Sequence, residues 1–156
     1  MAHPTDPAIP AGNPTEEFQR RCEHIEESYE FMLAYAAQGL SGNEGSQSGG
    51  QAREFLQRAA AALSGLGEVF SILINQERRE PVERYRAFLS VLERDARDAL
   101  AAVELVLAQP AISSQLVDNL NASIHLRALL TDLFLIDEVL KSQRYEGKPS
   151  KVETPE

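Results

Sequence analysis

The chain has 156 residues, a formal net charge of −9 and a pI of about 4.9. A single domain of this length buries enough apolar surface to fold without disulfides or structural metals, and its one cysteine excludes an internal disulfide. The acidic balance argues against nucleic-acid binding, which needs clustered Lys and Arg, because even the most basic stretch, ERREPVERYR at 77–86, interleaves its arginines with glutamates.

The first segment, 1–13, contains three prolines and is predicted to be a flexible leader. It has neither the basic start nor the apolar stretch of a secretory signal. No run elsewhere approaches the ~20 apolar residues that span a bilayer. Together with the single cysteine, these features favour a cytoplasmic protein that does not bind membranes.

A first helix is predicted to begin at Pro14, because Asn13 is a good N-cap and proline suits the first helical position. Its apolar residues recur at heptad spacing, which predicts one buried seam: Phe18, Cys22, Ile25, Tyr29, Met32 and Ala36. The following stretch, QGLSGNEGSQSGG at 38–50, is rich in Gly and Ser. We predict that it is a mobile connector with little contact to the core.

A second helix follows at once, with the seam Ala52, Leu56, Ala59, Leu63, Leu66, Phe70 and Leu73. Gly65 and Gly67 lie inside this segment, and each lowers its helix propensity by about 1 kcal/mol. Two explanations stay open. Either the helix weakens at these glycines, or another helix packs close to them.

A third helix is predicted from Pro81 to near Pro110, because proline suits a helix start and disfavours a helix just before it. Its seam is the most regular of the chain: Val82, Tyr85, Leu89, Leu92, Ala96, Ala99, Val103 and Val106. A fourth helix is predicted from about Ser113 to Lys141. The polar, proline-containing tail, 143–156, is predicted to be disordered.

No segment shows the sustained alternation of a β-strand, so the predicted fold is all-α. Four helices of about 25 residues, most of them with heptad seams, favour an antiparallel four-helix bundle, up-down-up-down, over residues 14–142. An extended hairpin that completes its bundle only as a dimer is the alternative topology.

The stretch CEHIEESYE at 22–30 gathers a thiol, an imidazole and several carboxylates. Cys22 and His24 lie about 200° apart on a helix, so they cannot ligate one metal ion. The Glu-x-x-His motifs of di-iron bundles are absent, as are a Walker lysine and a Gly-x-Ser-x-Gly elbow. We therefore expect a solvated acidic face, no metal site, no cofactor and no catalytic residues. Cys22 is expected to be buried and to react slowly, since nearby carboxylates raise the pKa of a thiol.

One further polar arrangement lies in the fourth helix, where Asp118, His125 and Asp132 are spaced by seven. Neighbours two turns apart are ~10 Å apart, which is too far for a hydrogen-bonded dyad within one helix. A polar flank beside the seam is the favoured interpretation. The alternative is a ligand site that His125 completes with Glu26 or Tyr29, in a cavity lined by the aromatic residues Tyr29, Tyr35, Phe70 and Tyr85.

The fourth helix is apolar nearly all round. Its early apolar residues form one stripe, and those from Leu126 onward form another, roughly opposite. Late in the second helix, Ile72 also lies outside its seam. The second and fourth helices of an up-down-up-down bundle end at the same end of the bundle, so apolar residues that the core does not need meet there. The predicted interaction residues are Ile72, Leu130, Phe134 and Leu135. The alternative is a kink near His125 that buries both stripes inside the bundle.

These features favour a non-catalytic helical interaction protein, such as an adaptor, a chaperone or a regulatory subunit. It is expected to bind a helical protein partner, or a second copy of itself as a homodimer, through apolar helix faces. The alternative function is a bundle that binds a cofactor or small molecule at a site near His125.

Overall fold

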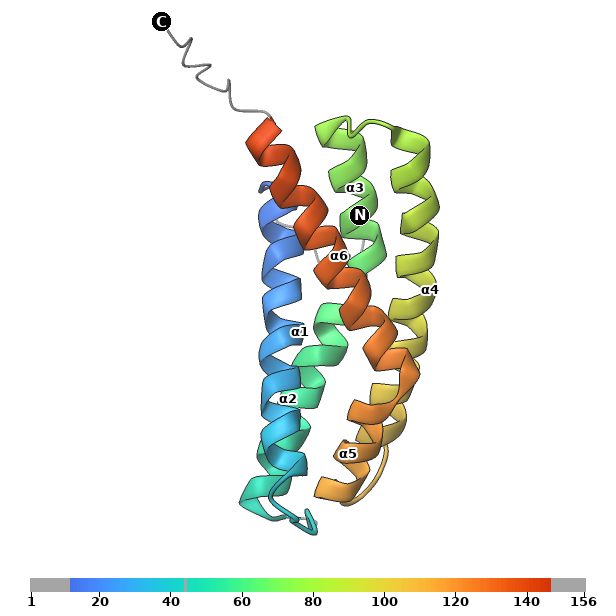
Figure 1. Cartoon of the computed structure of the whole chain (residues 1–156). Coiled ribbons are helices and arrows are strands. Elements are labelled where there is room, and N and C mark those ends of the chain that lie inside the picture. The colour runs from blue at the N-terminus through green and yellow to red at the C-terminus, as the bar shows by residue number, and fades with distance from the viewer. Residues whose placement is uncertain (1–11, 44, 147–156) are drawn as a thin grey trace, which may run out of the picture.

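The computed structural model describes residues 12–43 and 45–146, and these form six α-helices with no strand among them (Figure 1). The predicted all-α class is therefore confirmed. The helices are α1 (Pro14–Ala36), α2 (Gln47–Leu63), α3 (Leu66–Glu77), α4 (Val82–Leu107), α5 (Ser114–Ala122) and α6 (Ile124–Glu146).

The predicted leader, 1–13, and the predicted tail, 143–156, lie mostly outside the described residues. At the C-terminal boundary the structure differs from the prediction, because α6 continues through Glu146 and includes the first residues assigned to the tail. At the N-terminal boundary, α1 begins at Pro14 as predicted. The Asn13 side chain accepts a hydrogen bond from the N–H of Thr15 at 3.0 Å and so caps the first turn.

The predicted second helix is in fact two helices, α2 and α3, because the chain breaks at Ser64 and Gly65. Gly65 takes a left-handed φ of 79°, which glycine adopts without a steric penalty. The Arg21 side chain of α1 donates to the Ser64 carbonyl at 2.6 Å and caps the end of α2. A Cβ at Gly67 would collide with the Glu93 side chain of α4. Both explanations for the two glycines therefore apply: the helix is interrupted, and a neighbour packs close.

The predicted fourth helix is also two helices, α5 and α6, which separate at Ser123. This residue has an extended backbone, and its side-chain oxygen accepts a hydrogen bond from the N–H of His125 at 3.2 Å, as an N-cap does. The predicted alternative, a kink near His125 that buries both apolar stripes, is correct in that the chain bends at Ser123. The bend turns most of both stripes toward the core. The burial that this alternative predicted is only partial, because three large apolar residues stay exposed: Ile124, Phe134 and Leu135.

Two long helices, α1 and α4, frame the fold. α1 packs against α2, α3 and α5, and α4 packs against α2, α3, α5 and α6. Figure 1 shows α6 crossing the front diagonally, with its start near α4 and its end near α1. The four predicted helices are six in the structure because of the two breaks. The predicted α2–α3 seam is wholly buried: Ala52, Leu56, Ala59, Leu63, Leu66, Phe70 and Leu73.

The lower end of the molecule in Figure 1 is formed by the connections 37–46 and 108–113. Leu40 and Ser114 are joined by two hydrogen bonds, of 2.8 and 2.9 Å, and Gly42, with a φ of 62°, is buried against the carbonyl of Ile112. The predicted lack of core contact for 38–50 is therefore wrong. Small residues let this backbone approach the 112–114 backbone closely, and the last residues of the predicted loop belong to α2, which Ser46 caps.

One segment of the described chain, Gln47–Glu77, is long and apolar enough to cross a bilayer by length and composition alone. It comprises α2 and α3, and half of its most apolar window is buried inside the fold. Since the core helices of a folded domain pass the same test, this is weak evidence for a membrane span.

Candidate functional site

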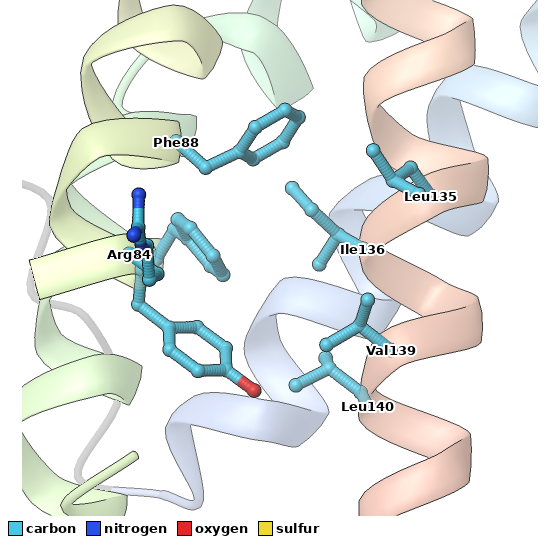
Figure 2. Close-up of a pocket in the computed structure, with 8 residues that line it drawn as sticks. Arg84, Phe88, Leu135, Ile136, Val139 and Leu140 are labelled. Atoms are coloured by element: carbon cyan, nitrogen blue, oxygen red, sulfur yellow. The ribbon is translucent and has the colours of Figure 1, made fainter. Parts of the chain in front are cut away.

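An open apolar cleft lies between α4 and α6, toward the upper end of the molecule where α3 connects to α4. It has a volume of about 300 Å³, and nearly all of its wall is carbon. Figure 2 shows Phe88 on α4 pointing toward the apolar side chains of α6, with the Arg84 side chain beside α4. The lining residues are Phe70, Arg84, Tyr85, Phe88, Leu135, Ile136, Val139 and Leu140.

The cleft exists because the seam of α4 is covered along only part of its length. From Leu92 onward every predicted seam residue is buried, whereas Val82, Tyr85 and Leu89, in the first two turns, are only half-buried. The diagonal path of α6 explains the difference, since α6 starts near α4 and ends near α1 (Figure 1). The upper part of α4 is thus left without a full covering helix.

Apolar side chains continue from the cleft onto the surface. Leu135 lines the cleft and is 52% exposed, and Val91, one helical turn beyond Phe88, is 38% exposed. Exposed apolar residues that adjoin one another mark interaction sites more often than scattered ones do. We call Phe88, Val91, Leu135 and Val139 the α4–α6 face.

The predicted interaction residues do not form one surface. Leu135 lies on the α4–α6 face. Phe134 is exposed, but it lies about 100° farther around α6 and does not line the cleft. Leu130 is buried in the core, which removes it from any surface, and Ile72 of α3 is half-buried.

A charged group stands at each end of the α4–α6 face. At the upper end, the side chain of Arg84 makes no hydrogen bond or ion pair with the described side chains. At the other end, Asp95 of α4 lies beside Asp132 of α6. Asp132 is only 8% exposed, and its Oδ2 has no hydrogen-bond partner among the described residues. Burial, followed by the hydrogen bond and the charge of Asp95, raises the pKa of Asp132 to about 7.

The acidic stretch at 22–30 lies along α1, and part of it faces α6. Cys22 is half-buried rather than buried, in a small cleft with Glu26 and Asp137. Burial and then the charge of Glu26 raise the pKa of the Cys22 thiol to about 12, in the direction the sequence predicts. Asp137 forms an ion pair with Lys141 at 2.9 Å. Within 12–43 and 45–146, no group of three His, Cys, Asp or Glu side chains is placed to hold a metal ion.

The polar series of the fourth predicted helix does not come together as a site. His125 and Asp118 are exposed, while Asp132 turns inward toward α4. The aromatic residues proposed to line one cavity are also dispersed. The Tyr35 hydroxyl donates to the Ile112 carbonyl at 2.6 Å at the lower end, whereas Phe70 and Tyr85 line the upper cleft.

The sequence reasoning missed Arg84, Phe88 and Asp95. A signal for them is present, because Arg84, Phe88, Val91 and Asp95 follow the heptad steps +4, +3, +4 one position before the core seam. Comparison with known proteins finds no matching family model, no matching curated protein and no matching solved structure. The function must therefore be inferred from this surface and its chemistry.

Proposed function

We propose that the protein is a non-catalytic helical interaction protein that binds a protein partner, or a second copy of itself, through the α4–α6 face. The observation that carries the proposal is the open apolar cleft of about 300 Å³, with Leu135 exposed in its lining and Val91 exposed one helical turn beyond Phe88. Covering this surface removes apolar area from water, which is the main driving force of helix–helix association.

The proposal treats the fold as an antiparallel four-helix bundle, up-down-up-down, in which α2–α3 and α5–α6 each form one interrupted arm. These two arms pack against α4 and bury its seam from Leu92 onward. The upper half has a vacant position where a further helix fits against Phe88 and Leu135, in the manner of an amphipathic helix that docks in a groove.

A second candidate is a small-molecule site in the same cleft. Its volume lies at the lower limit of typical ligand pockets, and three of its lining residues are aromatic: Phe70, Tyr85 and Phe88. The site near His125 that the sequence suggested has less support, because His125 is exposed and does not line this cleft.

Photo-crosslinking tests the proposal directly. A photoreactive phenylalanine analogue replaces Leu135 in the full-length chain, in the cells that produce the protein. The matched control carries the analogue at Leu105, a residue of α4 that is 68% exposed and lies outside the cleft. We expect a protein adduct from position 135 and a much weaker one from position 105. If irradiation at position 135 yields no protein adduct above the control, the proposed function is wrong.

A further inference from the structure

One side of α4, with Arg84 and Val91 exposed and Phe88 and Asp95 half-buried, carries a short pattern with an apolar centre and opposite charges at its ends. Arg84, Phe88, Val91 and Asp95 lie on one stripe of the helix, because their spacing follows the heptad steps +4, +3, +4. Asp95 lies eleven positions after Arg84, which corresponds to roughly 16 Å along the helix axis. The guanidinium thus stands at one end of the stripe, the carboxylate stands at the other, and apolar side chains lie between them.

This pattern is complementary to itself. A two-fold axis midway between Phe88 and Val91 places a second α4 antiparallel to the first. Arg84 then lies opposite the partner's Asp95, and Phe88 lies opposite the partner's Val91. In a two-fold interface each contact occurs twice, so the arrangement forms two ion pairs around one apolar centre. Ala87, a small residue beside this stripe, allows the two helices to approach closely.

Neither charged side chain at the ends of this stripe has an ion-pair partner among the described side chains of the single chain. The Arg84 side chain has no anionic partner among the described side chains of 12–43 and 45–142. Asp95 is hydrogen-bonded to the Asp132 carboxyl, and neither carboxyl forms an ion pair with a cation of the described side chains. Buried carboxylates are normally paired or hydrogen-bonded, and a guanidinium is the donor best matched to them. Each copy therefore offers the cation that the other lacks.

We propose that the partner of the α4–α6 face is a second copy of this chain, held by antiparallel packing of two α4 helices, with Arg84 of each copy paired to the partner's Asp95. This inference rests on the proposed function, since it identifies the occupant of the same surface. The paired charges determine the register of the interface, because sliding one helix by a turn would bring each charge opposite an apolar residue.

Charge reversal tests the pairing. Analytical ultracentrifugation of the wild-type chain is expected to show a concentration-dependent dimer. Arg84→Glu creates two carboxylate–carboxylate contacts in that dimer, and Asp95→Arg creates two guanidinium–guanidinium contacts. Each single variant is expected to raise the dimer dissociation constant by about a hundredfold or more. Both should remain folded by circular dichroism, since Arg84 has no partner within the described chain and the Asp95→Arg side chain would lie beside Asp132.

Two combinations make the test specific. Mixing the two single variants pairs opposite charges at both ends, so we expect a heterodimer at concentrations where each variant alone is monomeric. The double variant, Arg84→Glu with Asp95→Arg, should dimerise again by itself. Arg86→Glu and Glu93→Arg are matched controls, because these exposed residues lie on the opposite side of α4 and should leave dimerisation unchanged.

The outcomes separate this inference from the proposed function. A wild-type chain that is monomeric at every concentration overturns the inference. A dimer that both single variants retain, or variants that do not recombine as a mixture, overturns it as well. If position 135 nevertheless crosslinks to a different protein, the proposed function stands and only the identity of the partner is wrong.

Discussion

The lower end of the molecule is closed by its two connecting segments, whereas the upper end keeps an open cleft. At the lower end, two connections interlock through buried hydrogen bonds, with Ser114 bonded to both Leu40 and Tyr35. At the upper end, a short charged turn joins α3 to α4, and the cleft beside Phe88 remains open. The lower end is thus closed by its connecting segments, whereas the upper end stays open because α6 ends near α1 and leaves the upper part of α4 uncovered (Figure 1).

The side chains near the helix termini also interact differently at the two ends. At the lower end, Arg53 donates to the carbonyls of Leu107 and Gln109, at 2.6 and 2.8 Å, and so satisfies the last turn of α4. At the upper end, Arg78 takes a left-handed φ of 48°, and Arg79 pairs with Glu77 close to the chain reversal. Glu77 also accepts a hydrogen bond from the Thr15 hydroxyl, which joins this charged turn to the start of α1.

The largest expected effect concerns Gly42 at the lower end. Gly42→Ala places a Cβ against the Ile112 carbonyl on a backbone with positive φ, so we expect a loss of about 3 kcal/mol or more in the free energy of unfolding. Gly39→Ala is the control. Gly39 also has a positive φ, of 66°, but a Cβ there meets nothing, and a loss of only about 1–2 kcal/mol is expected. Urea denaturation measures both, and equal losses would show that the lower end is not tightly interlocked.

Ser114 provides a second way to open the lower end. Its hydroxyl donates to the Tyr35 carbonyl at 2.6 Å and accepts from the Leu40 N–H at 2.8 Å. Ser114→Ala leaves a buried N–H without its acceptor, and we expect a loss of about 2 kcal/mol. Ser113→Ala, which removes only the N-cap bond to the Leu116 N–H, should cost about 1 kcal/mol. If Ser114→Ala is neutral in urea melts, the two connections are not joined through this hydroxyl.

The contact between α4 and α6 is expected to weaken as the pH rises. The pKa of Asp132 is raised to about 7, so the folded chain holds a proton that the unfolded chain releases near pH 4. The stability that this proton contributes is fully present below the unfolded pKa and is lost as the pH rises through about 7. Above that pH, two carboxylates face each other between the helices.

Asp132→Asn removes this pH dependence while keeping the shape of the side chain. The difference in unfolding free energy between the variant and the wild type should grow from pH 4 to pH 8, at protein concentrations where the chain is monomeric. Asp118→Asn, at an exposed position of α5, should not change the slope. Parallel pH profiles for wild type and Asp132→Asn would contradict the assignment.

The smallest expected effect is at the upper end. Leu135 is half exposed at the edge of the cleft, so Leu135→Gln should change the free energy of unfolding by less than about 0.5 kcal/mol. Leu133→Gln, two residues earlier and buried in the core, should cost several times more. A large loss from Leu135→Gln in the isolated chain would mean that the cleft is already closed by the chain itself.

Local sequence patterns predict much of the fold. Heptad spacing identifies the buried seam of α2–α3 without error, and the Asn13–Pro14 pair locates the start of α1. These features depend on neighbours within one or two turns, which the sequence displays directly. The prediction of a mobile connector at 38–50 is wrong because glycines are equally typical of a mobile linker and of a backbone that packs closely against another backbone segment.

The sequence by itself determined the all-α class, the seams and the surplus of apolar residues on the last predicted helix. It also contained the pattern of Arg84, Phe88, Val91 and Asp95, although nothing in the spacing separates an exposed stripe from a covered one. Only the tertiary structure decided that Leu130 is buried while Leu135 stays exposed, and that Asp132 meets Asp95. The physical reason is that burial depends on where α6 crosses α4, and the break at Ser123, together with contacts between residues far apart in the chain, determines that crossing.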